Sequence, residues 1–144
     1  MYRRQGRPCL KTTSDPAKAT LPGRKRVLRA VDRDGRLVMD VLDLVGETGE
    51  PFRAGTTAFD PANPQRCKVV PVDCELVDCR AVVMDGGRQQ VPSPPLPEMA
   101  DYCARQLARL PEGSLRLVNP HRYKVGVSRR LLLQREALIR AAEG

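Results

Sequence analysis

The chain has 144 residues, of which 41% are hydrophobic and 3% aromatic, and its formal net charge is +8. This length fits one soluble domain or a large part of one, with a core built from aliphatic side chains. The scarcity of aromatic residues argues against recognition of single-stranded nucleic acid by base stacking. No apolar run reaches the roughly 18 residues of a membrane span.

Positive charge is concentrated at the start of the chain. Residues 1–36 hold eleven Lys or Arg and three acids, whereas the rest of the chain holds fourteen of each sign. Such a segment can meet the phosphates of a small molecule, a nucleic acid or an acidic partner. It can equally be a solvated strand surface whose acidic complement lies in another domain, and the sequence leaves both interpretations open.

The first half of the chain predicts β-structure. Segments 7–13 and 24–31 are predicted strands, separated by a turn at Thr20-Leu21-Pro22-Gly23. An Asp-Gly turn at 32–35 leads into a strand over 37–45, because Asp-Gly accepts the backbone geometry of tight hairpins. That strand is apolar at most positions, which predicts cover on both faces. One of its faces carries Leu37, Met39, Val41 and Asp43.

More strands are expected after a polar link. Segments 52–59, 67–72 and 75–84 are candidates, and Asp85-Gly86-Gly87 marks a turn that closes this part. Four prolines within 91–97 predict an extended connector and a change of architecture. Residues 1–90 are therefore expected to form a β-rich segment.

The last third predicts two helices. One apolar stripe at helical spacing is formed by Leu96, Met99, Cys103, Leu107 and Leu110. Pro111 and Gly113 end that helix, and Ser128 is the expected N-cap of a final helix over 129–142. The final helix is expected to pack through Leu131, Leu132, Leu138 and Ile139. The fold class is α+β, with an antiparallel β-rich first two-thirds followed by two C-terminal helices in a segment over 91–144.

A complete catalytic constellation is missing from the sequence. His121, the one histidine, lies in a loop beside Pro120, where a structural role is expected, and Ser128 is read as a helix cap. Cys67, Cys74 and Cys79 lack the paired spacing of zinc sites. We therefore assign no catalytic residue and no metal ligand. The five cysteines are expected to be reduced, buried or half-buried thiols of a cytosolic protein.

Charged residues give weaker signals. The carboxylates at Asp40 and Asp43, and those of Asp73, Glu75 and Asp78, are predicted to be surface charges. No glycine-rich phosphate loop of a known pattern is present. Arg24 and Lys25 follow Gly23 directly and can face an anion, although this pattern is weak by itself.

Three blocks of the sequence resemble the C-terminal region of nicotinate phosphoribosyltransferases. Residues 6–11 and 18–25 (GRPCLK and KATLPGRK) resemble the family's "GRPRxKLS…KxTLPGxK" segment. Residues 107–111 (LARLP) are similar to its "QLxxLP" helix ending, and residues 119–128 (NPHRYKVGVS) to its "NPHxYxVxLS". The blocks occur in the family's order, and residues 46–90 between them match least. The resemblance makes segments 1–90 and 91–144 parts of one C-terminal subdomain.

The resemblance implies an enzyme that joins nicotinate to phosphoribosyl pyrophosphate, coupled to ATP hydrolysis, and makes nicotinate mononucleotide for NAD biosynthesis. It implies a catalytic α/β barrel, Mg²⁺, a phosphorylated barrel histidine and a homodimer. The sequence itself, with neither a signal peptide nor a membrane-length apolar run, predicts a cytoplasmic location without membrane attachment. A barrel of about 250 residues cannot fit in this chain, so we expect the barrel upstream and no catalysis by this part alone. His121 does not correspond to the phosphorylated histidine.

Two further expectations remain open at this stage. Arg24 and Lys25 are candidate substrate-binding residues that set the field around anionic substrates or a dimer partner; the alternative is that they are surface cations beside a turn. The alternative function is an autonomous basic module for nucleic acid or another anionic partner, with nucleic acid disfavoured by the missing aromatic residues.

Overall fold

A computed structural model describes residues 20–46 and 50–143 of the chain. Its strands are β1 (Lys25–Val31), β2 (Leu37–Leu44), β3 (Thr57–Phe59), β4 (Cys67–Val69), β5 (Glu75–Asp78), β6 (Met84–Asp85), β7 (Arg88–Gln89) and β8 (Val125–Val127). Its α-helices are α1 (Leu96–Ala108) and α2 (Arg129–Glu143), with a 3₁₀ turn, η2, over Glu112–Leu115. The strand predicted over 7–13 lies outside the described residues.

The central sheet has six strands in the order β4-β3-β8-β2-β1-β5. All its pairings are antiparallel except that of β2 with β8, which is parallel. The α+β class with two C-terminal helices is confirmed. The parallel strand β8 was not predicted: it comes from the last third of the chain and lies between two strands of the first half. Strands from the described parts of segments 1–90 and 91–144 therefore share one sheet.

The β1–β2 hairpin agrees with its sequence pattern. Gly35 has a φ of 78°, and the Asp32 carboxylate accepts hydrogen bonds from the backbone N–H groups of Asp34 and Arg36 at 3.0 and 2.8 Å. The Asp side chain and the left-handed glycine thus build the predicted turn. Several other predicted strands were too long, because only 57–59, 67–69 and 75–78 form ladder pairs in the central sheet.

The core lies mainly on one face of the β1–β2 ladder. A buried cluster there consists of Leu28, Ala30, Met39, Val41, Phe52, Ala58, Val70 and Cys74. A second buried cluster joins α2 to the sheet through Leu44, Val127, Leu131 and Leu132. Leu138 and Ile139 are half-buried, so the predicted packing face of the final helix is present and tightest in its first turn. The Ser128 cap is confirmed, since its hydroxyl accepts from the N–H of Leu131 at 3.4 Å.

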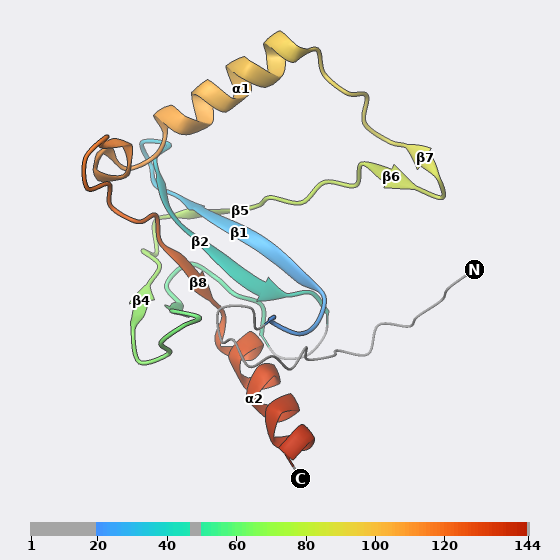
Figure 1. Ribbon diagram of the computed structural model, residues 1–144, viewed down its shortest axis with the longest axis vertical. Coiled ribbons are helices and arrows are strands. Elements are labelled where there is room, and N and C mark those ends of the chain that lie inside the picture. Colours follow the sequence, from blue (N-terminus) through green and yellow to red (C-terminus); the bar gives the residue numbers. More distant parts are fainter. Residues whose placement is uncertain (1–19, 47–49, 144) are drawn as a thin grey trace.

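A long segment projects from the sheet. After β5 the chain runs out to the β6–β7 hairpin, and α1 returns from there toward the β1–β2 turn (Figure 1). We call residues 79–108 the arm. It is tied back at its end by Arg109, whose Nε donates to the carbonyl of Gly35 at 2.7 Å and whose carbonyl accepts from the N–H of Leu37 at 2.8 Å. No helix in the described ranges is long and apolar enough to cross a membrane.

Candidate functional site

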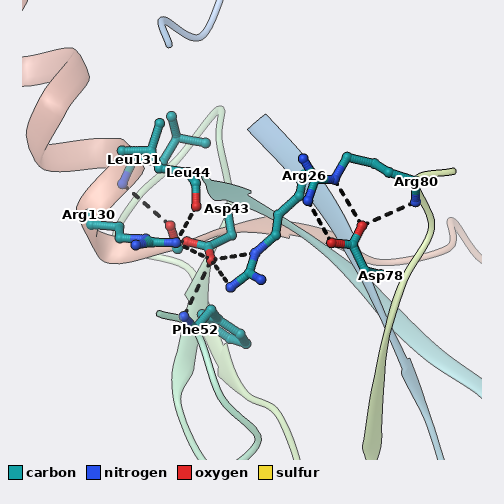
Figure 2. A network of polar contacts seen from close by, with 9 residues as sticks. Arg26, Asp43, Leu44, Phe52, Asp78, Arg80, Arg130 and Leu131 are labelled. Carbon is teal, nitrogen blue, oxygen red and sulfur yellow. Dashed lines mark hydrogen bonds and ion pairs between the residues drawn. The ribbon is translucent and has the colours of Figure 1, made fainter. Parts of the chain in front are cut away.

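Asp43 is the centre of a buried polar network. The prediction from the sequence that it is a surface charge was therefore wrong. Its side chain is 0% exposed. Arg130 in the first turn of α2 donates from Nε to Oδ1 and from Nη2 to Oδ2, each at 2.6 Å. Arg26, its partner across the β1–β2 ladder, donates from Nε and Nη2 to Oδ2 at 3.2 and 3.0 Å. Figure 2 shows both guanidinium groups converging on this carboxylate.

The same carboxylate also binds the segment that leads toward β3. The backbone N–H of Phe52 donates to Oδ2 of Asp43 at 3.3 Å, and the Ser128 side chain adds a further hydrogen bond. Burial alone would raise the pKa of Asp43, but the hydrogen bonds from Arg130, Ser128, Arg26 and Phe52 outweigh it and hold the pKa at about 2. Asp43 therefore stays ionised and connects β1, β2, α2 and the segment before β3.

Asp40 forms a second network, centred on β2 on the opposite face. Arg29, again the cross-strand partner, donates from Nε and Nη2 to the two carboxylate oxygens at 3.0 and 2.9 Å. The Tyr123 hydroxyl donates to Oδ1 at 3.1 Å. The Asp40 side chain is only 13% exposed, so its prediction as a surface charge was wrong as well. Burial and then the negative charge of Asp40 raise the pKa of Tyr123.

The remaining predicted surface carboxylates are exposed. Asp78 pairs with Arg80, the second residue of the arm, at 2.8 Å, and Asp73 lies 3.5 Å from Arg33. The hydrogen bond from Arg80 is the main cause that lowers the pKa of Asp78, and the charge of Arg26 lowers it further. In Figure 2, Arg26 lies between the carboxylates of Asp43 and Asp78. These exposed pairs contribute little to stability.

The two candidate substrate-binding residues differ in their surroundings. The Lys25 ammonium donates to the backbone carbonyls of Leu21 and Gly23 at 2.7 and 2.9 Å, so it closes the turn that precedes β1. The Arg24 side chain is exposed, and its backbone carbonyl accepts from the N–H of Val45 at 2.8 Å. Of the pair, Arg24 therefore has the more exposed side chain.

The arm carries exposed apolar side chains. Helix α1 has no buried residue, and Leu96, Met99 and Leu107 of the predicted stripe are 81%, 44% and 51% exposed. The stripe itself is confirmed, but no described element covers it. The extended residues before the hairpin add Val82 and Val83, which are also exposed. Exposed apolar side chains gathered along one helix face are typical of an interaction surface.

Comparison with known proteins assigns the chain to a family. The family described as nicotinate phosphoribosyltransferase C-terminal domain matches residues 24–134. The chain belongs to this family. The nicotinate phosphoribosyltransferases of Homo sapiens and Bos taurus are 32% and 35% identical to it, each over 88% of this chain and 23% of their own length. Nicotinate phosphoribosyltransferase 2 of Arabidopsis thaliana is 33% identical, over 86% and 22%.

A solved structure supports the same assignment. The crystal structure of human nicotinic acid phosphoribosyltransferase superimposes with a TM-score of 0.64 and 32% identity, over 83% of this chain and 24% of that one. The resemblance identified in the sequence is thus confirmed. The chain spans about a quarter of the length of the relatives it matches. These matches give no support to an autonomous basic module.

The described part of this nicotinate phosphoribosyltransferase C-terminal domain contains no group of three or more His, Cys, Asp or Glu side chains placed to hold a metal ion. Cys67, Cys79 and Cys103 are exposed and only Cys74 is buried, so the expectation of buried or half-buried thiols was wrong for most of the described cysteines. The His121 ring lies close to Gly113, and the backbone N–H of His121 donates to the Gly113 carbonyl at 2.8 Å.

The network residues could have been found from one sequence signal. Asp43 lies on the same face of the strand as Leu37, Met39 and Val41. A carboxylate on the apolar face of a strand requires buried cationic partners. The cross-strand arginines follow from the hairpin register. Arg130 and Tyr123 had no such signal, because α2 and β8 reach the sheet only through tertiary packing.

Proposed function

We propose that this chain is the non-catalytic C-terminal part of an enzyme that joins nicotinate to phosphoribosyl pyrophosphate with coupled ATP hydrolysis, yielding nicotinate mononucleotide. The family match and the partial span of the relatives support the proposal. The observation that carries it is the arm, whose apolar stripe needs a covering surface that the described residues do not supply. In this proposal the stripe docks on the catalytic part of the same polypeptide.

The roles within the complete enzyme follow from this arrangement. The sheet and α2 form a folded base held by the Asp43 network, and the arm extends from that base to the catalytic part. Mg²⁺, ATP and the two substrates belong to the catalytic part in this proposal. Arg24 contributes positive charge near anionic substrates or a dimer partner, while Lys25 maintains the turn beside it. The proposed enzyme is a cytoplasmic homodimer.

Complementation of a truncated relative tests the proposal. The human enzyme without the segment that matches this chain would be assayed for nicotinate mononucleotide formation alone, with the 144-residue chain added, and with the chain fused in place of that segment. We expect no turnover by the chain alone, low activity of the truncated enzyme and restored activity of the fusion. Turnover by the chain alone, or a fusion as inactive as the truncated enzyme, would contradict the proposal.

A further inference from the structure

A basic cavity lies between the β3–β4 hairpin and the segment that enters β8. It has a volume of about 630 Å³. Four cationic side chains line it, namely Arg66, Lys68, Arg122 and Lys124. Its apolar lining includes Met39, Ala58 and Phe59, and the single carboxylate among the lining residues is Asp60.

Strand pairing brings these cations together from distant parts of the sequence. Lys68 in β4 is the register partner of Ala58 in β3, and β3 pairs with β8 through Phe59 and Val127. Lys124 directly precedes β8, and its carbonyl accepts from the N–H of Asp40 at 3.0 Å. The two lysines therefore reach the cavity from opposite sides of the β3–β8 contact, on backbone fixed by the sheet.

The cavity also depends on the glycine in its floor. A Cβ atom at Gly126 would lie 2.8 Å from the Cβ of Ala58 and 3.2 Å from Cε of Met39. Without a side chain at this position, β8 approaches β3 and the core closely. The floor is consequently formed by closely packed backbone and side chains.

The positive charge of the cavity is not neutralised by the described residues. Arg26, Arg29, Arg33, Arg80 and Arg130 each pair with a carboxylate, whereas none of the four cavity cations does so in the described ranges. Oδ1 of Asp60 is already engaged by the backbone N–H groups of Ala62 and Asn63 at 2.8 and 3.2 Å. Burial and then the charge of Lys124 lower the pKa of Lys68, and an anion between the two ammonium groups would offset the repulsion between them.

We propose that this basic cavity binds a small molecule carrying a diphosphate group, held by Lys68 and Lys124 with Arg66 and Arg122 at the rim. The volume falls within the range of roughly 300–1,000 Å³ that is typical of small-molecule sites. Four cations and one carboxylate leave an excess of positive charge that matches a diphosphate better than a single phosphate. Lysines and arginines are the usual phosphate ligands. A concave site of this size favours a small ligand over an acidic protein surface. The proposal concerns binding by this chain and does not require the transferase activity proposed above.

Calorimetric titration of the 144-residue chain with inorganic pyrophosphate and with inorganic phosphate tests the site. We expect pyrophosphate to bind more tightly than phosphate, and Lys68→Met/Lys124→Met to weaken pyrophosphate binding by at least about tenfold, since two charge-assisted contacts are lost. The control Arg88→Gln/Arg105→Gln removes the same charge from exposed positions of the arm and should bind as the wild type does.

Amide chemical shifts of the wild-type chain give a second measurement that needs no variant. Pyrophosphate should shift the signals of Lys68, Lys124 and Gly126. Absence of binding, shifts confined to other residues, or equal weakening in the two double variants would overturn the proposal. Because no nicotinate or turnover is involved, these outcomes are independent of the complementation assay.

Discussion

The carboxylate of Asp43 in β2 and the guanidinium of Arg130 in α2 meet in a two-point contact, with Nε–Oδ1 and Nη2–Oδ2 distances of 2.6 Å. The contact is buried, since the side chains of Asp43 and Arg130 are 0% and 12% exposed. Arg130 also donates to the carbonyl of Leu44. One guanidinium thus fixes the start of the last helix to the end of the central strand.

Arg130→Met should destabilise the chain strongly. The substitution leaves the fully buried carboxylate with Arg26 as the one remaining guanidinium among the described residues, and breaking a buried pair in this way costs about 3–5 kcal/mol. Thermal unfolding of the purified chain measures the effect. Arg140→Met, which removes an exposed cation from the same helix, is the matched control and should change stability by less than about 0.5 kcal/mol. Equal stability of the two variants would refute the role given to Arg130.

Acid should unfold the chain in part through Asp43. Its pKa lies at about 2 in the folded state against an ordinary value of 3.8, so the folded state binds the proton less readily. The resulting stabilisation, about 2 kcal/mol, is present above pH 3.8 and is lost as the pH falls toward 2. Urea unfolding between pH 5 and pH 2 measures it. Asp43→Asn should be less stable at pH 5 and show a shallower decline, and parallel curves would contradict the assignment.

Local patterns predicted those parts of the fold that local chemistry determines. The Asp32-to-Gly35 turn, the β1–β2 hairpin and the Ser128 cap depend on residues within a few positions of one another, and all three are present. Strand β8 is three residues long and contains a glycine, so it is too short to show the alternation of apolar and polar residues by which a strand is recognised. It forms because β2 and β3 offer it partners on both sides.

The candidate site was harder to predict for a related reason. The alternation of β2 indicates that Asp43 is buried, but nothing near Asp40 or Asp43 in the sequence identifies Tyr123 or Arg130 as their partners, since both come from the other end of the chain. The stripe on α1 shows the opposite case. Its spacing predicted an apolar face correctly, but α1 has no buried residue and no described element covers the stripe.

Gly126→Ala should loosen the contact between β8 and β3. The new Cβ would lie 2.8 Å from the Cβ of Ala58, and relieving such overpacking typically costs about 1–3 kcal/mol. The second substitution Ala58→Gly removes the obstructing atom. We therefore expect the double variant to lose less unfolding free energy than the two single variants lose together. Denaturant unfolding of the wild type and the three variants measures this difference. Strict additivity would show that the close approach is not the cause.

Charge reversal next to the turn should separate the two candidate substrate-binding residues. In the fusion with the truncated human enzyme, Arg24→Glu should raise the KM for phosphoribosyl pyrophosphate without lowering the melting temperature, because its side chain is exposed. Lys25→Glu should lower the melting temperature, since it loses the bonds to the carbonyls of Leu21 and Gly23. An unchanged KM in Arg24→Glu would leave Arg24 as a surface cation and remove the substrate role.

The apolar stripe of α1 should determine whether the arm docks on the catalytic part. Met99→Lys/Leu107→Lys places two charges on that face, and each buried side chain of this kind contributes about 1.5–3 kcal/mol. We expect the variant to bind the truncated human enzyme at least about 100-fold more weakly than the wild-type chain in calorimetric titration.

A matched control separates the stripe from the effect of charge. Glu98→Gln/Asp101→Asn changes the net charge of α1 by the same amount on positions outside the stripe, and both side chains are exposed. This control should bind as the wild-type chain does, because it leaves the apolar face intact. If both double variants weakened binding equally, the arm would act through its charge and the stripe would have another partner. If neither double variant weakened binding, docking would occur through a different surface of the domain.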